Sequence, residues 1–367
     1  MANSPLKRAL TFHVTTLEPG DQDQTHTTEG YFSTPQTKSW LRLEDALEAA
    51  GRSSKTYLAY FNKLDRLIAR EPDFLDAYNY AGNAYLELAD CQDAVESPIS
   101  LCLAQESYAK AFERAKALIP PDFSGQIIWG NLDNRPFLRA HHGLIICHLR
   151  RKAYATAAQM IEEHLLWNPN DNIGVRFLLG DAYLLAGDTV NARRALAAGV
   201  LERYPDNAYS LGLLEFREGN YAAAATALRT GFLGNIYIAE ILTGRTVEKP
   251  HFFWHGISWA TVRSAKSYLF QQDMLNFWKA TPQAVDFADW LFNCAAVLRE
   301  RLEWAEIREG LTYEHDFAVR SAFSDREAAL RKKVQKITMF IRKVSNRQGE
   351  EHWPWEHSDS DLLLEKH

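Results

Sequence analysis

Apolar residues recur every three or four positions over most of the chain, which is the period of a helix with one buried face. The first clear run contains one apolar stripe, made by Tyr57, Tyr60, Phe61, Leu64, Leu67 and Ile68. Ser53 or Ser54 is the expected N-cap of this helix, and Pro72 should end it. Weaker helical patterning starts near Leu41. We therefore predict N-terminal helices over residues 41–75.

Residues 1–40 lack this period. The stretch 14–38 is rich in Thr, Gln, Asp and Gly, and it predicts an extended N-terminal arm. The first residues contain no apolar run of signal-peptide length, and no part of the chain approaches the roughly 18 apolar residues of a membrane helix. We expect a cytoplasmic protein without a transmembrane segment.

The pattern becomes repetitive in the middle of the chain. Landmarks in residues 180–199 recur at one offset in residues 212–231, with a period of about 32 residues. The pairs are Gly180 and Gly212, Gly187 and Gly219, Ala192 and Ala224, Leu196 and Leu228, and Gly199 and Gly231. A repeat of this length suits two antiparallel helices joined by short turns.

Each landmark has a physical role. The first glycine lets the partner helix approach closely, and the second ends the first helix by adopting a positive φ. The leucine fills the space between repeat units. Two further units begin near Asp76 and Pro136, the first with an insertion after Ala89. We predict a repeat array over 76–244.

These landmarks resemble the tetratricopeptide repeat signature. The segments WGNLDNRPFLRAHHGL (129–144) and LLWNPNDNIGVRFLLGDAYL (165–184) are similar to a group of largely uncharacterised bacterial tetratricopeptide repeat proteins. The resemblance covers about residues 72–236 and implies an all-α, tetratricopeptide-like α-solenoid of antiparallel helix pairs. After Gly244 the repeat fades, and helical patterning predicts a helical C-terminal extension over 245–348. An acidic flexible tail is expected over 349–367. No activity is attached to this group.

A solenoid of this kind suggests a scaffold or adaptor that binds a protein or peptide on its concave face. The candidate groove residues are Tyr78, Asn79, Asn134, Arg135, Arg139, His142, Asp171, Asn172, Arg176 and Asp181. Arginines of neighbouring repeats could together hold a carboxylate, because each offers a planar fork of donors. In the structural alternative, Asn134 and either Asp171 or Asn172 cap helices, and the arginines pair with carbonyls or with Asp171.

Candidate chemistry is sparse. The net charge of -6 argues against a general nucleic-acid binder. No catalytic or phosphate-binding motif occurs, so we predict a non-enzyme without a cofactor. His141 and His142 are adjacent and point to different helix faces, whereas His251 and His255 flank a Phe-Phe-Trp loop with no interleaved acid. We therefore predict no metal site.

The four cysteines, Cys91, Cys102, Cys147 and Cys294, form no CxxC pair, and we interpret them as small buried thiols in a reducing compartment.

Two alternative functions stay open. One is an enzyme or regulator whose site lies unrecognised in residues 245–348. The other is electrostatic docking to nucleic acid or a membrane through a basic helix at 325–346, whose apolar stripe would be Val334, Ile337, Phe340, Ile341 and Val344. A capping helix that closes the array explains the same pattern.

Overall fold

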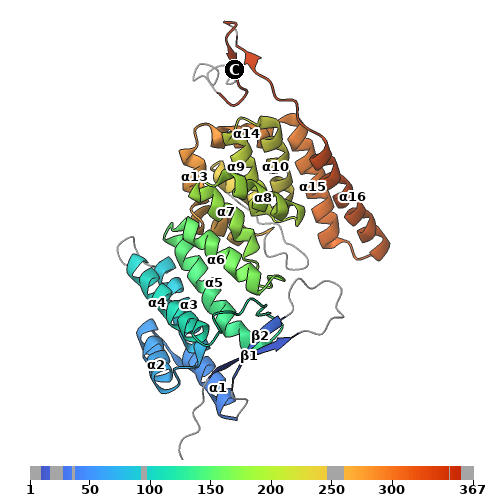
Figure 1. Ribbon diagram of the computed structural model, residues 1–367. Coiled ribbons are helices and arrows are strands. Elements are labelled where there is room, and N and C mark those ends of the chain that lie inside the picture. Colours follow the sequence, from blue (N-terminus) through green and yellow to red (C-terminus); the bar gives the residue numbers. More distant parts are fainter. Residues whose placement is uncertain are drawn as a thin grey trace, which may run out of the picture. The chain divides into compact units, whose positions relative to one another are not determined.

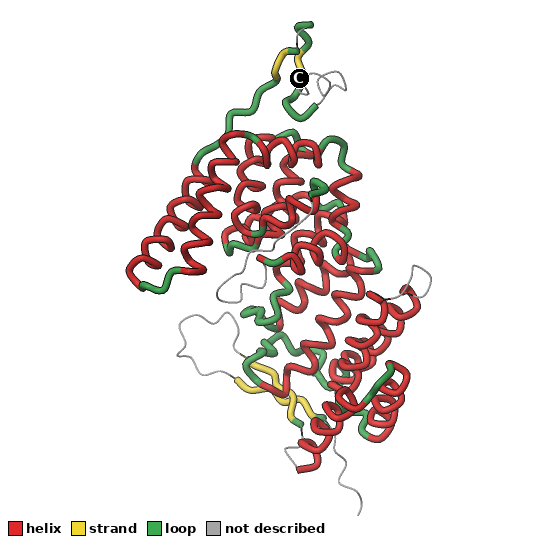
Figure 2. Tube along the Cα trace, turned by 180° about the vertical axis from the view of Figure 1, so that it is seen from behind, coloured by secondary structure: helices red, strands yellow, loops and turns green. Residues whose placement is uncertain are grey.

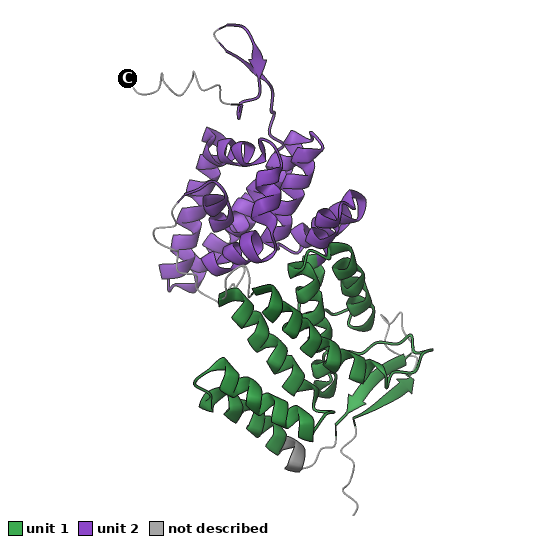
Figure 3. Cartoon of the chain, turned by 90° about the vertical axis from the view of Figure 1, so that its left-hand side faces the viewer, with its two compact units in different colours: residues 1–178 green, residues 179–367 purple. Residues whose placement is uncertain are grey.

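The computed structural model describes residues 10–16, 28–34, 38–91, 97–245, 260–346 and 348–356. Most of these residues are helical, with short strands near each end (Figures 1 and 2). The chain divides into two compact units, Met1–Leu178 and Leu179–His367 (Figure 3). The prediction of a mainly α-helical chain is confirmed.

Unit 1 is built from successive antiparallel helices. They are α1 (Lys38–Ser53), α2 (Tyr57–Arg70), α3 (Leu75–Cys91), α4 (Ser97–Lys116), α5 (Arg135–Arg150) and α6 (Tyr154–Trp167), with the short 3-10 helix η1 (Leu132–Asn134) before α5. Each of these α-helices packs on the next, and α3 also contacts α5 (Figure 1). The N-cap of α2 is Thr56, whose hydroxyl accepts the Ala59 N–H at 3.2 Å, so the expected cap at Ser53 or Ser54 was wrong.

A β-hairpin lies where the sequence predicted an extended arm. Strands β1 (Thr11–Thr16) and β2 (Thr28–Ser33) pair antiparallel, with Thr11 opposite Ser33. Gly30 and Phe32 of β2 are buried, which is the two-residue alternation of a strand that covers a core. The Phe32 N–H donates to Asn134 Oδ1 at 2.9 Å, so the hairpin is fixed to the start of α5.

Unit 2 continues the helical pairing. It contains most of α7 (Arg176–Ala186), which crosses the boundary, then α8 (Thr189–Leu201), α9 (Pro205–Arg217), α10 (Tyr221–Gly234), α11 (Ile236–Leu242), α12 (Val262–Lys266), the π-helix η3 (Ser267–Gln271), α13 (Met274–Ala280), α14 (Ala284–Asn293), α15 (Ala295–Tyr313), α16 (Phe317–Lys336), β3 (Val344–Ser345) and β4 (Glu351–His352). Helix α9 packs on α8 and α10, and α15 packs on α16.

The repeated glycines have the predicted physical roles. A Cβ added to Gly180 would lie 2.5 Å from the Leu196 side chain, and one added to Gly212 would lie 2.6 Å from Leu228. Both helix pairs therefore need a residue without a side chain at this contact. Gly187, with a φ of 84°, follows the end of α7 in the left-handed conformation that the sequence predicted.

The last helix differs from the expected one at 325–346. It begins at Phe317, where the Asp316 carboxylate accepts the N–H groups of Ala318 and Val319, and it ends at Lys336. Ile337 is extended, and its carbonyl accepts a hydrogen bond of 2.7 Å from Arg229 Nη1. This bond to another helix replaces the next helical turn, so the apolar stripe does not continue on a helix beyond Val334.

The expected flexible tail is partly ordered. Trp355 is 1% exposed and its ring packs against the rings of Phe216, Tyr221 and Phe287. These aromatic contacts anchor the segment up to Glu356, and residues 357–367 lie outside the described part of the chain. Among the described residues, no helix combines the length and the apolar character needed to cross a membrane.

Candidate functional site

A hollow of about 370 Å³ lies between α3 and α5 in unit 1. Its lining residues come from α3, α4 and α5: Asn79, Tyr80, Asn83, Leu86, Tyr108, Arg139, His142, Gly143 and Ile146. Three of the predicted groove residues, Asn79, Arg139 and His142, therefore meet at one site. A hollow of this size can receive a few residues of a bound chain or a small ligand.

Tyr108 of α4 forms the floor of the hollow because two glycines make room for it. A Cβ on Gly82 of α3 would lie 2.6 Å from the Tyr108 ring, and one on Gly143 of α5 would also collide with it. The ring is 2% exposed, and its hydroxyl donates to Asn83 Oδ1 at 2.6 Å. Any side chain at either glycine would therefore displace this tyrosine.

The walls follow the helical period. Asn79, Asn83 and Leu86 lie on one face of α3, and Arg139, Gly143 and Ile146 lie on one face of α5 at the same spacing. Side chains three or four apart share a helix face, so the two helices present matching rows to the space between them.

Two ion pairs join α3 to α5. Arg139 Nη1 lies 3.2 Å from both carboxylate oxygens of Asp76, and Arg150 binds Asp90 with two N–H groups at 2.8 and 3.2 Å. Arg139 lines the hollow and Arg150 does not. The two arginines are three helical turns apart, about 16 Å along α5. This length corresponds to about five residues of extended chain.

The polar groups of the hollow are mostly neutral. Only part of the His142 side chain reaches the surface, and the loss of water around its ring lowers its pKa to about 4, so the imidazole is uncharged at neutral pH. Asn79 donates to the Pro136 carbonyl at 2.9 Å, and Tyr80 is 39% exposed. Arg139 already binds Asp76, but its guanidinium carries further N–H donors. The site offers amide, imidazole, hydroxyl and guanidinium groups, which suit hydrogen bonding to a peptide backbone.

Three other predicted residues hold the fold of unit 1 instead. The Tyr78 hydroxyl donates to the Pro72 carbonyl at 3.2 Å, and its side chain is buried. Asn134 occupies the N-cap position of α5 without capping it, because its side chain binds Phe32 in the hairpin. Arg135 Nε donates to the Trp129 carbonyl at 3.1 Å, with its guanidinium over that indole ring.

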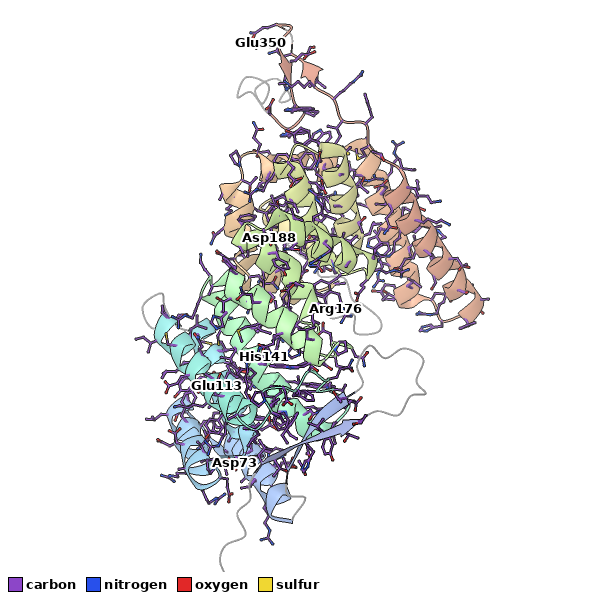
Figure 4. The ribbon with its side chains drawn as sticks, in the orientation of Figure 1. Asp73, Glu113, His141, Arg176, Asp188 and Glu350 are labelled. Carbon is purple, nitrogen blue, oxygen red and sulfur yellow. The ribbon has the colours of Figure 1, made fainter. Side chains whose placement is uncertain are left out.

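Asp171 and Arg176 form the start of α7. The Asp171 carboxylate accepts the N–H groups of Gly174, Val175 and Arg176, and Arg176 Nη1 lies 3.1 Å from its Oδ2. Figure 4 labels Arg176 at this helix end. Asn172 is exposed. The structure therefore gives Asp171 and Arg176 the capping and pairing roles of the structural alternative, and it does not bring Arg139 and Arg176 together around one carboxylate.

Asp181 belongs to unit 2 and is not a lining residue of the hollow. It is 3% exposed, and burial raises its pKa to about 7. Asp206, also buried, has a pKa raised well above its ordinary value by burial and by the charge of Asp181. Asp181 and Asp206 form a buried acidic pair within unit 2, and neither residue lines the hollow.

The remaining histidines and cysteines add no metal chemistry among the described residues. His141 is buried and stacks on Phe112, and no group of three or more His, Cys, Asp or Glu could hold a metal ion there. His251 and His255 lie outside the described residues. Of the four free cysteines, Cys147 is buried but Cys91 and Cys102 are exposed, so the expectation of buried thiols was wrong for those two.

Comparisons of the chain with protein-family models, curated proteins and solved structures found no match.

Sequence reasoning missed several lining residues, namely Tyr80, Asn83, Leu86, Tyr108 and Ile146. A signal was present, because Asn83 and Leu86 follow Asn79 at helical spacing and Ile146 follows Arg139 in the same way. No such spacing could have indicated Tyr108 at the floor, because its position depends on Gly82 of α3 and Gly143 of α5.

Proposed function

We propose that this protein is a scaffold or adaptor that binds a segment of a protein or peptide in the hollow between α3 and α5. The observation that carries the proposal is the hollow itself, which has matched helical rows as walls, a tyrosine floor and mainly uncharged hydrogen-bonding groups. A peptide backbone presents one donor and one acceptor per residue, and side-chain amides can satisfy both.

We further propose that the helix pairs of residues 76–244 are tetratricopeptide-type repeats, in which the first helix of each pair faces the ligand. Both α3 and α5 are first helices of predicted units, and both line the hollow. We place such an adaptor in the cytoplasm of a bacterium, in line with the sequence resemblance and with four unpaired thiols.

Two arginines on α5 provide a matched test. Peptides that bind the full chain are first selected from a displayed library, and their affinities are then measured by fluorescence anisotropy. Arg139→Ala should weaken binding by about tenfold, which corresponds to the loss of one charge-assisted hydrogen bond. Arg150→Ala removes an equivalent pair with α3 outside the hollow and should leave the affinity unchanged. Equal losses in the two variants, or none in either, would count against this site.

A further inference from the structure

A second hollow, of about 320 Å³, lies within unit 2 where α16 passes the α8–α9 turn and the end of α10. Its lining carries three cations, Arg203, Arg331 and Lys332, and none of its lining residues is acidic. Much of the remaining wall is aliphatic, including Leu201 and Leu233. The hollow therefore combines positive charge with apolar surface.

The three cations differ in how they are held. Arg331 is fixed, because its Nε lies 3.0 Å from Glu327 Oε1 and its Nη2 donates to the Leu233 carbonyl at 3.2 Å. Arg203 and Lys332 are exposed, and neither pairs with a carboxylate in the described part of the chain. The charge of Arg203 also helps to lower the pKa of Arg331, after the larger effect of burial, so the two guanidinium groups are close enough to repel each other. Two positive charges at this hollow are therefore uncompensated.

Arg203 also has an unfavourable backbone conformation. Its φ is 64°, in the left-handed region, and it closes α8 with hydrogen bonds from Arg203 N to the Val200 carbonyl and from Tyr204 N to the Gly199 carbonyl, both 3.0 Å. Glycine is the usual residue at this position of a helix end, and Gly187 follows α7 in the same conformation. A side chain here costs roughly 1 kcal/mol.

We propose that this hollow binds a phosphate monoester carried by a small apolar group. A phosphate monoester has close to two negative charges at neutral pH, which matches the two uncompensated cations. The Arg203 guanidinium can bind two phosphate oxygens at once, Lys332 adds a point charge, and Arg331 stays anchored at the wall. Leu201, which is exposed, and Val200, which is partly exposed, face the apolar part of the ligand.

The probes for the test are phenyl phosphate, inorganic phosphate and benzoate, titrated into the full chain by calorimetry at low salt. Phenyl phosphate should bind about tenfold more tightly than inorganic phosphate, because only it has apolar surface to bury. It should also bind more tightly than benzoate, which has a single charge. Vesicles that contain phosphatidic acid test a lipid headgroup as the source of the phosphate. Binding of vesicles without binding of phenyl phosphate would overturn the proposal.

Arg203→Gly separates binding from stability. Glycine relieves the left-handed strain, so the melting temperature should not fall, whereas the affinity for phenyl phosphate should drop at least about tenfold. Lys332→Gln should give a similar loss. Lys152→Gly makes the same backbone change in unit 1, where Lys152 has a φ of 60°, and should bind phenyl phosphate normally. No binding by the unmodified chain, or unchanged binding by Arg203→Gly, would overturn the proposal.

Discussion

Arg229 of α10 and Glu300 of α15 form a two-point ion pair inside unit 2. The Nε and Nη2 atoms of Arg229 lie 2.9 and 2.5 Å from the two carboxylate oxygens, and the residues are 2% and 7% exposed. The same guanidinium donates to the Ile337 carbonyl at 2.7 Å, just beyond α16. One arginine thus ties α10 to α15 and to the segment that follows α16.

Glu300→Ala should destabilise unit 2 by about 3–5 kcal/mol, because the mutation leaves a buried guanidinium without its counter-charge. Urea denaturation followed by circular dichroism measures the change in the free energy of unfolding. Glu306→Ala is the control, since its pair with Arg326 is exposed and should contribute little. Similar losses in the two variants would show that burial does not decide the effect.

This ion pair also shows what the sequence could not reveal. The helical period and the glycine landmarks predicted the helix pairs, because both depend on contacts between residues close in the chain. Arg229 and Glu300 carry no such pattern, and their pairing depends on how α15 packs against α10. For the same reason the helical pattern wrongly predicted that α16 continues past Ile337. In the structure, the Ile337 carbonyl accepts a hydrogen bond from Arg229 instead of one from the next helical turn.

The candidate site was predictable in part. Asn79, Arg139 and His142 were found because they project from first helices of the predicted repeats. Asp171 and Arg176 were predicted as groove residues because of their charged side chains. In the structure, they bind each other at the start of α7. The two residues are five apart, and the capping alternative had anticipated this interaction. Tyr108 could not be found, since its place needs Gly82 and Gly143 to lie on either side of it.

Gly180→Ala tests the close helix contact in unit 2. The new Cβ would lie 2.5 Å from Leu196, so we expect a destabilisation of about 1–3 kcal/mol from overpacking. Gly51→Ala in α1 is the control, because the atom nearest to its added Cβ is 4.0 Å away and alanine is the better helix former. Urea denaturation of both variants distinguishes them. A neutral or stabilising Gly180→Ala would refute the role given to this glycine.

Unit 2 should lose stability as the pH rises from about 4 to about 7. Burial raises the pKa of Asp181 to about 7, so over this range the folded state keeps a proton that the unfolded state has released. The slope is up to about 1.4 kcal/mol per pH unit for each such group, and the raised pKa of Asp206 acts in the same direction. Hydrogen exchange of peptides from α9 measures the stability of unit 2 at each pH. Asp181→Asn should reduce the slope of stability against pH. Stability that increases over this range would contradict the assignment.

Unit 1 should show the opposite dependence on pH. Burial lowers the pKa of both His142 and His164 to about 4, so below about pH 6.5 the unfolded state binds protons that the folded state does not. Stability should therefore fall as the pH drops from about 6.5 to about 4 and stay constant above that range. Exchange of α5 and α6 amides reports the effect. His164→Gln should reduce the slope of stability against pH. An unchanged slope would show that groups other than His164 cause the pH dependence.

Photo-crosslinking of a selected peptide tests the proposed binding function most directly. In one variant, benzoylphenylalanine replaces Tyr80, which lines the hollow. In the control variant, it replaces Tyr313 of α15 in unit 2, which is 70% exposed. We expect a crosslink to the peptide from position 80, its loss when excess unlabelled peptide competes, and no crosslink from position 313. Crosslinks of equal yield from both positions, or from position 313 alone, would contradict it.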